Sequence, residues 1–75
     1  MDFPQYRKRF DSKSFYKIVN ERTFEEVQFI GDKVFKHQIK ADKYFEIIQI
    51  QDMLKAEGGM YLFSSELEYN KYQAM

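Results

Sequence analysis

The 75-residue chain carries twelve Lys and Arg against twelve Asp and Glu, so its net charge is zero and no global field draws it to nucleic acid or to a membrane surface. It has no cysteine and one histidine, which excludes disulfides, thiolate metal sites and clusters of histidine ligands. Eight Phe and six Tyr are more rings than so small a domain can fully bury, so we expect some at the surface, where they favour interfaces.

We expect a single small domain, residues 1–75, because a chain of this length can bury only one modest core. No apolar run approaches the roughly 18 residues of a membrane span. The N-terminal segment MDFPQYRKRF lacks the apolar centre of a signal peptide. Since the chain begins with Met and has no cysteine, we interpret it as a complete cytoplasmic protein with no membrane partner.

The N-terminal segment predicts a hairpin. Residues 5–10 (QYRKRF) and 14–19 (SFYKIV) are rich in aromatic, β-branched and long side chains, and they flank the turn-forming stretch Asp11-Ser12-Lys13. Pro4 precedes the first strand, where its missing N–H costs nothing.

The next segment, NERTFEEV, predicts a short helix near residues 20–26. Thr23 and Glu26 have the spacing of a capping box. Phe24 and Val27 lie three residues apart, as one face of a helix would place them.

The centre of the chain predicts a second hairpin and a further strand. The runs VQFI and KVFK flank Gly31-Asp32, and glycine at the first position of a two-residue turn suits a type II′ hairpin, because that residue needs a positive φ. The second strand of this hairpin runs over about 33–40. A turn at Asp42-Lys43 and the run YFEIIQIQ predict another strand over residues 44–51.

The C-terminal segment predicts a short strand and a helix. Gly58-Gly59 interrupts the chain before MYLF, residues 60–63, which is typical of a strand. In the tail SSELEYNKYQAM, Ser65 and Glu68 have capping-box spacing and begin a helix. The predicted fold class is therefore α+β, an antiparallel β-meander of five to six strands with one C-terminal helix and the short helix near residues 20–26.

The two central turns decide which side chains share a face of the sheet. One face is apolar, and we expect it to form the core beneath the C-terminal helix; it collects Ile30, Phe35, His37, Ile39, Ala41, Tyr44, Ile48 and Ile50. The other face has an apolar centre and a basic rim; it collects Phe29, Val34, Lys36, Lys40, Phe45 and Ile47. Because interfaces have this anatomy, we interpret the second face as a partner-binding surface. The alternative is that the first hairpin folds over it and makes it core.

None of the polar groups has the pattern of an active site. His37 has no nucleophile or second ligand at a useful spacing. The carboxylates at 25–26 and at 66 and 68 fall at predicted helix starts, where capping and the helix dipole account for them. Gly58-Gly59 lacks the spaced glycines and the lysine of a phosphate loop. We therefore expect no enzyme, no metal site and no cofactor.

The N-terminal strand suggests a second class of function, nucleic-acid binding. The segment YRKRF combines aromatic rings, which can stack on bases, with cations, which can hold phosphate, and its candidate residues are Tyr6, Arg7, Lys8 and Arg9. In a strand, however, Tyr6 and Lys8 share one face while the two arginines share the other, which separates the rings from the guanidinium groups. We keep nucleic-acid binding as the alternative.

The string YRK…KSFYKI…FEEVQFIG…IQDM resembles a type of small bacterial protein. This resemblance covers most of the chain, carries no catalytic motif, and implies a bacterial cytoplasmic setting without any particular activity. The expected function is a non-enzymatic protein-interaction module, or a small accessory or regulatory protein. It would work as a homodimer or with another protein partner.

Overall fold

A computed structural model describes residues 2–73 of the chain. Within them it places five strands and two helices: β1 (Gln5–Arg9), β2 (Ser14–Asn20), β3 (Thr23–Ile30), β4 (Lys33–Lys40), α1 (Tyr44–Lys55), β5 (Tyr61–Phe63) and α2 (Glu66–Gln73). The strands form one antiparallel sheet in the order β4-β3-β2-β1-β5. The predicted α+β class is confirmed, and β4 and β5 are the two edges of the sheet.

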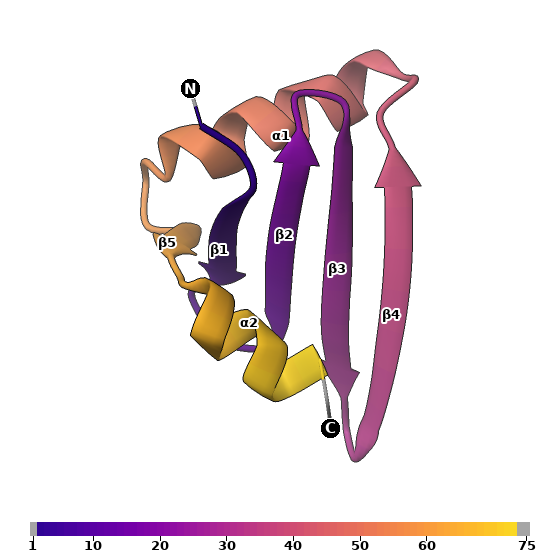
Figure 1. Cartoon of the computed structure of the whole chain (residues 1–75), viewed down its shortest axis with the longest axis vertical. Helices are drawn as coiled ribbons and strands as arrows, with labels where there is room; N and C mark the ends of the chain where they lie inside the picture. Colours follow the sequence, from indigo (N-terminus) through magenta and orange to yellow (C-terminus); the bar gives the residue numbers. More distant parts are fainter. Residues whose placement is uncertain (1, 74–75) are drawn as a thin grey trace.

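The two helices cover opposite faces of the sheet and opposite ends of its strands (Figure 1). On one face Ile50 and Met53 of α1 pack with Tyr16, Ile18 and Phe24. On the other face Tyr69 of α2 packs with Phe15 and Val27. Alternate residues of β2 and β3 are therefore buried in two separate cores, one beneath each helix.

Both predicted hairpins are confirmed. Strands β1 and β2 flank residues 10–13, where the Lys13 N–H donates to the Asp11 carboxylate at 3.0 Å. Strands β3 and β4 meet at Gly31, whose φ of 63° provides the left-handed conformation that glycine adopts freely. The predicted register of this hairpin is also observed, with Ile30 opposite Lys33 and Val27 opposite Lys36.

The short helix predicted near residues 20–26 is wrong. Residues 21 and 22 form a turn in which the Arg22 N–H donates to the Asn20 side chain at 2.8 Å, and β3 begins at Thr23. The three-residue spacing of Phe24 and Val27 suggested one face of a helix. In the sheet the two side chains point to opposite faces, and each is buried because each face has its own core.

The strand predicted over residues 44–51 is also wrong, because these residues belong to α1. Ile47, Ile50 and Leu54 follow helical spacing, and all three pack into the core beneath the helix. At the start of α1 the Lys43 N–H donates to the Glu46 carboxylate at 3.1 Å. The helix ends at Ala56, which is left-handed with φ 51°. The described residues therefore contain a helix, α1, that was not predicted, in addition to the predicted C-terminal one.

The predicted C-terminal strand and helix are confirmed as β5 and α2. The Glu68 N–H donates to the Ser65 hydroxyl at 3.1 Å, as the predicted cap requires. The last two residues of the predicted helix, 74 and 75, lie outside the described residues. Strand β5 lies beside β1, at the far edge from β4. The meander therefore covers only β1 to β4.

The predicted core face is correct only in part. Ala41 and Ile50 are buried and Ile39 is partly buried, whereas four other members are exposed: Ile30, Phe35, His37 and Tyr44. Ile30 and Phe35 are exposed because α1 covers one end of its face and leaves the end near the β3–β4 turn open, whereas Tyr44 is an exposed residue of α1 itself. No helix within residues 2–73 combines the length and apolar character needed to cross a membrane.

Candidate interaction surface

The structure separates the residues of the predicted partner-binding face. Phe29, Val34, Lys36 and Lys40 lie on the face of the sheet that α2 covers. Phe45 and Ile47 lie instead in α1, which packs on the other face. The predicted surface therefore does not exist as one face, because the run that supplied Phe45 and Ile47 is a helix.

Two of the four residues that do share a face, Phe29 and Val34, pack against the core beneath α2. The ring of Phe29 packs against Phe15 at 6.0 Å between centroids and against Tyr72 at 5.5 Å. Helix α2 supplies this cover, and the first hairpin cannot do so because β1 and β2 belong to the same sheet. Lys36 and Lys40 are exposed along β4, while Ile47 is half-buried against the core beneath α1 and Phe45 is exposed.

The basic residues of β1 do not form one surface either. Arg7 lies on the α1 face and is 5% exposed. Its guanidinium donates to the carbonyl oxygens of Met53 at 2.7 Å and Leu54 at 3.0 Å, in the last turn of α1. Burial lowers the pKa of Arg7. This arginine is therefore a structural cap inside the protein.

The three neighbours of Arg7 are also engaged. Lys8 lies on the α2 face and forms an ion pair with Glu68 at 3.3 Å. Arg9 lies on the α1 face, with its Nε 3.6 Å from the carboxylate of Asp11. The ring of Tyr6 packs against the ring of Tyr69 with centroids 5.7 Å apart. The alternation expected from sequence thus divides these residues between the two faces of the sheet.

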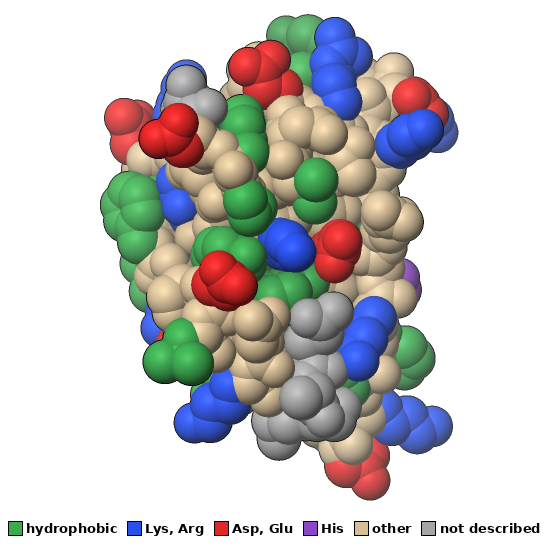
Figure 2. Space-filling model, viewed as in Figure 1, with side chains coloured by type: hydrophobic (Ala, Val, Ile, Leu, Met, Phe, Trp, Pro, Cys, Tyr) green, Lys and Arg blue, Asp and Glu red, His purple; other side chains and the backbone are tan. Residues whose placement is uncertain are grey.

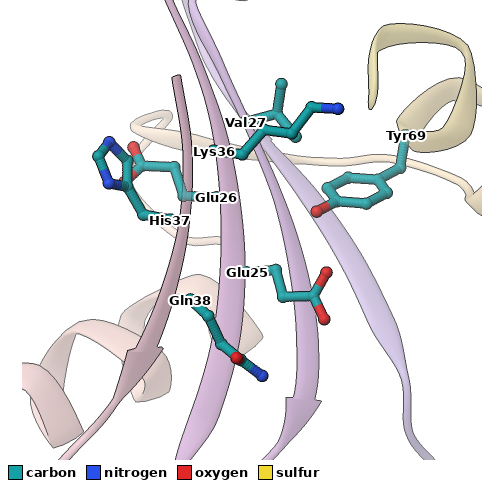
Figure 3. Close-up of a pocket in the computed structure, with 7 residues that line it drawn as sticks. All are labelled: Glu25, Glu26, Val27, Lys36, His37, Gln38 and Tyr69. Carbon is teal, nitrogen blue, oxygen red and sulfur yellow. The ribbon is translucent and has the colours of Figure 1, made fainter. Parts of the chain in front are cut away.

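A shallow hollow of about 310 Å³ lies beside Tyr69 on the α2 face. Glu25, Val27 and Lys36 point to the side of Tyr69, whereas Glu26 and His37 point away from it (Figure 3). The pKa of Tyr69 is raised, chiefly by burial and then by the nearby Glu25 carboxylate. Tyr69 of α2 and Glu25 of β3 therefore line this hollow together.

The remaining polar groups show no concentration of metal ligands. Within residues 2–73, no group of three His, Cys, Asp or Glu side chains is placed to hold a metal ion. His37 is exposed on the edge strand β4, where it lies opposite Glu26. Its predicted position in the core was wrong, because residues 44–51, which were expected to form the next strand of the sheet, belong to α1.

Exposed apolar side chains gather around β5. We call this patch the β5 surface; it comprises Phe10, Met60, Leu62, Phe63 and Leu67, all of them at least 40% exposed. Figure 2 shows apolar side chains at the margin of the molecule beside β5 and the start of α2. The other large exposed apolar residues lie apart, as Ile30 and Phe35 near the β3–β4 turn and as Tyr44 and Phe45 in α1.

The chain brings the members of the β5 surface together through the pairing of β5 with β1. The Phe10 N–H donates to the Met60 carbonyl at 3.0 Å, which joins the end of the first hairpin to the start of β5. Leu62 lies opposite Lys8 on the α2 face, and Phe63 lies opposite Arg7 on the α1 face. The Arg7 guanidinium carbon is 4.4 Å from the centre of the Phe63 ring.

Sequence reasoning missed this surface although it predicted the strand. The segment MYLF carries no charge, which is the signal that could have marked it. Its position at an edge depends on pairing with β1, more than fifty residues away in sequence. Comparisons of the chain with family models, with curated proteins and with solved structures found no significant match.

Proposed function

We propose that the chain is a non-enzymatic protein-interaction module, acting as a homodimer or as a small accessory protein, and that the β5 surface is its contact surface. One observation carries the proposal. Of the nine large apolar side chains that are exposed among the described residues, five lie in β5 or in the segments next to it along this edge of the sheet. Scattered apolar residues are normal on a monomer, whereas a contiguous patch of aromatic and aliphatic side chains is typical of a binding site.

The geometry around the patch supports this proposal. Arg7 is held from behind by α1 and presents its guanidinium to Phe63, so the exposed ring rests on a fixed support. Lys8 and Glu68 form an ion pair at 3.3 Å on the α2 side. An apolar centre beside polar groups is the anatomy of a protein interface. A cytoplasmic location belongs to the same proposal, because a chain without cysteine suits a reducing compartment.

The nucleic-acid alternative has less support. It requires Tyr6, Arg7, Lys8 and Arg9 to act together, but the two arginines lie on one face and the other two residues on the opposite face. Arg7 is buried, and its donors are used by backbone carbonyls.

The test compares Phe63→Gln with Phe45→Gln, which removes a phenylalanine of similar exposure, 69% against 65%, from a different part of the surface. We expect both variants to keep the circular dichroism spectrum and thermal midpoint of the wild type within a few degrees. Phe63→Gln should weaken association by about tenfold or more, as loss of an aromatic anchor does. Phe45→Gln should leave association unchanged. Sedimentation and quantitative pull-down from the native cell measure both.

Two results would contradict the proposal. Equal association of the two variants and the wild type would show that the β5 surface is not the contact surface. A wild-type chain that neither self-associates nor binds a protein, but is retained on an anionic polymer with a steep salt dependence, would favour the nucleic-acid alternative.

A further inference from the structure

The outer side of β5 presents unpaired backbone groups. The Ser64 N–H donates to the Tyr6 carbonyl at 3.1 Å and the Phe10 N–H donates to the Met60 carbonyl at 3.0 Å. Hydrogen-bonded pairs alternate along an antiparallel ladder, so Leu62 bonds toward β1 and the N–H and C=O groups of Tyr61 and Phe63 point outward. No other described segment supplies a backbone partner to these outward groups.

The two edges of the sheet differ in charge. Strand β4, KVFKHQIK, carries three lysines and no acidic residue. By the same alternation its outward residues include Lys36 and Lys40, so two β4 edges would gather four ammonium groups on one face. Lysines on an edge strand oppose edge-to-edge pairing. Strand β5, with Tyr61, Leu62 and Phe63, has no charge that would oppose a second copy of itself.

We propose that a second copy of this chain pairs antiparallel with β5 about a twofold axis at Leu62, which joins the two sheets into one. This inference rests on the proposed function and names the partner at the β5 surface. In this register Leu62 lies opposite Leu62 of the second copy, and Tyr61 lies opposite Phe63 of the second copy. The outward groups of Tyr61 and Phe63 then form four hydrogen bonds across the axis, because each of the two Tyr61–Phe63 pairs exchanges two.

The side chains of this register are complementary on both faces. On the α1 face, Phe63 of one copy lies beside Tyr61 of the other, and this pair of rings is flanked by Arg7 and Arg9, which lie opposite Phe63 and Tyr61 in β1. On the α2 face the two Leu62 side chains meet. Each copy also has Leu67, 83% exposed near the start of α2. The nearest cation on this face, Lys8, is already paired with Glu68.

Charge reversal at the twofold axis tests the register. Leu62→Lys and Leu62→Glu each place two like charges opposite one another, so each variant alone should be a monomer at concentrations where the wild type is a dimer in sedimentation. An equimolar mixture should recover a dimer, because Lys then lies opposite Glu. Leu62 is 40% exposed, and circular dichroism should show that both variants stay folded. Phe45→Lys, which adds a charge to exposed α1, should dimerise as the wild type does.

A single cysteine at position 62 gives a second measurement, which does not depend on whether the charged variants stay folded. The chain has no cysteine of its own. Residues directly opposite in an antiparallel pair lie about 4.5 to 5.5 Å apart at Cα, within the range of a disulfide. Leu62→Cys should therefore form a covalent dimer on mild oxidation. His37→Cys, at the middle of the exposed edge β4, should form no covalent dimer under the same conditions.

The outcomes separate this inference from the function on which it rests. A wild-type monomer at every concentration would overturn the second copy as partner, and charged variants that dimerise like the wild type would overturn its pairing at β5. If the wild type then binds a different protein and Phe63→Gln binds that protein more weakly, the proposed protein-interaction module stands. A wild-type dimer in which Leu62→Cys does not cross-link would overturn the register.

Discussion

Arg7 is the side chain that joins the first strand to the end of α1. Four hydrogen bonds hold its guanidinium: to Met53 O, Leu54 O, Tyr6 O and the side chain of Gln5, all between 2.7 and 3.0 Å. The carbonyl groups in the last turn of a helix have no partner within the helix and carry partial negative charge. Arg7 satisfies two of them from across the core, and this contact fixes the position of α1 on the sheet.

We expect Arg7→Met to lower the free energy of unfolding by about 2 to 3 kcal/mol, because the variant fills the space but leaves helix carbonyls without donors. Arg7→Lys should be intermediate, since an ammonium cannot reproduce the planar fork of a guanidinium. Urea unfolding measures both. Arg9→Met is the matched control. Its ion pair with Asp11 is exposed and should contribute less than about 1 kcal/mol. Equal losses for the Arg7 and Arg9 variants would show that the buried network is not needed.

At the scale of elements, α1 shows where sequence reasoning fails. The run YFEIIQIQ alternates well enough for a strand, and it also places Ile47 and Ile50 three residues apart, as a helix does. Short apolar runs satisfy both periods. The helical pattern becomes clear only when Met53 and Leu54 are included, since both pack into the same core as Ile50. The strand prediction ended at residue 51, before these residues.

Local signals predicted the turn at Gly31 and the cap at Ser65 correctly for the opposite reason. The positive φ of Gly31 and the bond from the Glu68 N–H to the Ser65 hydroxyl each depend on residues within a few positions of one another. The candidate site could not be predicted in the same way. It exists because β5 pairs with β1 and leaves its other side free, and such pairing between distant segments has no local signature.

The packing of α1 can be tested with Met53→Ala. Met53 is fully buried between the helix and the sheet. Truncation should lower the free energy of unfolding by about 2 to 5 kcal/mol, from lost burial and a residual cavity. Phe45→Ala, on the exposed side of the same helix, should change it by less than about 0.5 kcal/mol. Thermal or urea unfolding of the two variants gives the comparison. A similar loss from both would mean that α1 does not present the Met53 side to the sheet.

The whole molecule is one sheet with a small core on each side. Neither helix covers its face completely, so the stability of the domain depends on both cores together. Each core also contains a buried tyrosine: Tyr16, 3% exposed, beneath α1 and Tyr69, 2% exposed, beneath α2. Burial raises the pKa of Tyr16 to about 12, with a smaller contribution from the charge of Glu26. Burial likewise raises the pKa of Tyr69.

These two phenols predict how the domain unfolds in alkali. A tyrosine whose pKa is higher in the folded state than in the unfolded chain, where it is about 10, stabilises the fold fully below pH 10. Above pH 10 the unfolded chain loses the proton first, so the free energy of unfolding should fall by about 1.4 kcal/mol per pH unit for each such tyrosine. For Tyr16 this decline continues to about pH 12, where the folded state also ionises.

Tyr16→Phe isolates the contribution of the core beneath α1 to this pH dependence, because it keeps the ring and removes the ionisable hydroxyl group. For each protein the free energy of unfolding is compared with its own value at pH 7. Between pH 10 and 12 it should fall less steeply in the variant than in the wild type, and the two slopes should differ by about 1.4 kcal/mol per pH unit. Urea unfolding at a series of pH values measures the two slopes. Parallel slopes would mean that the Tyr16 phenol titrates alike in the folded and unfolded states. The sheet beneath α1 would then be open to water, and the cover that this helix provides would be incomplete at its centre.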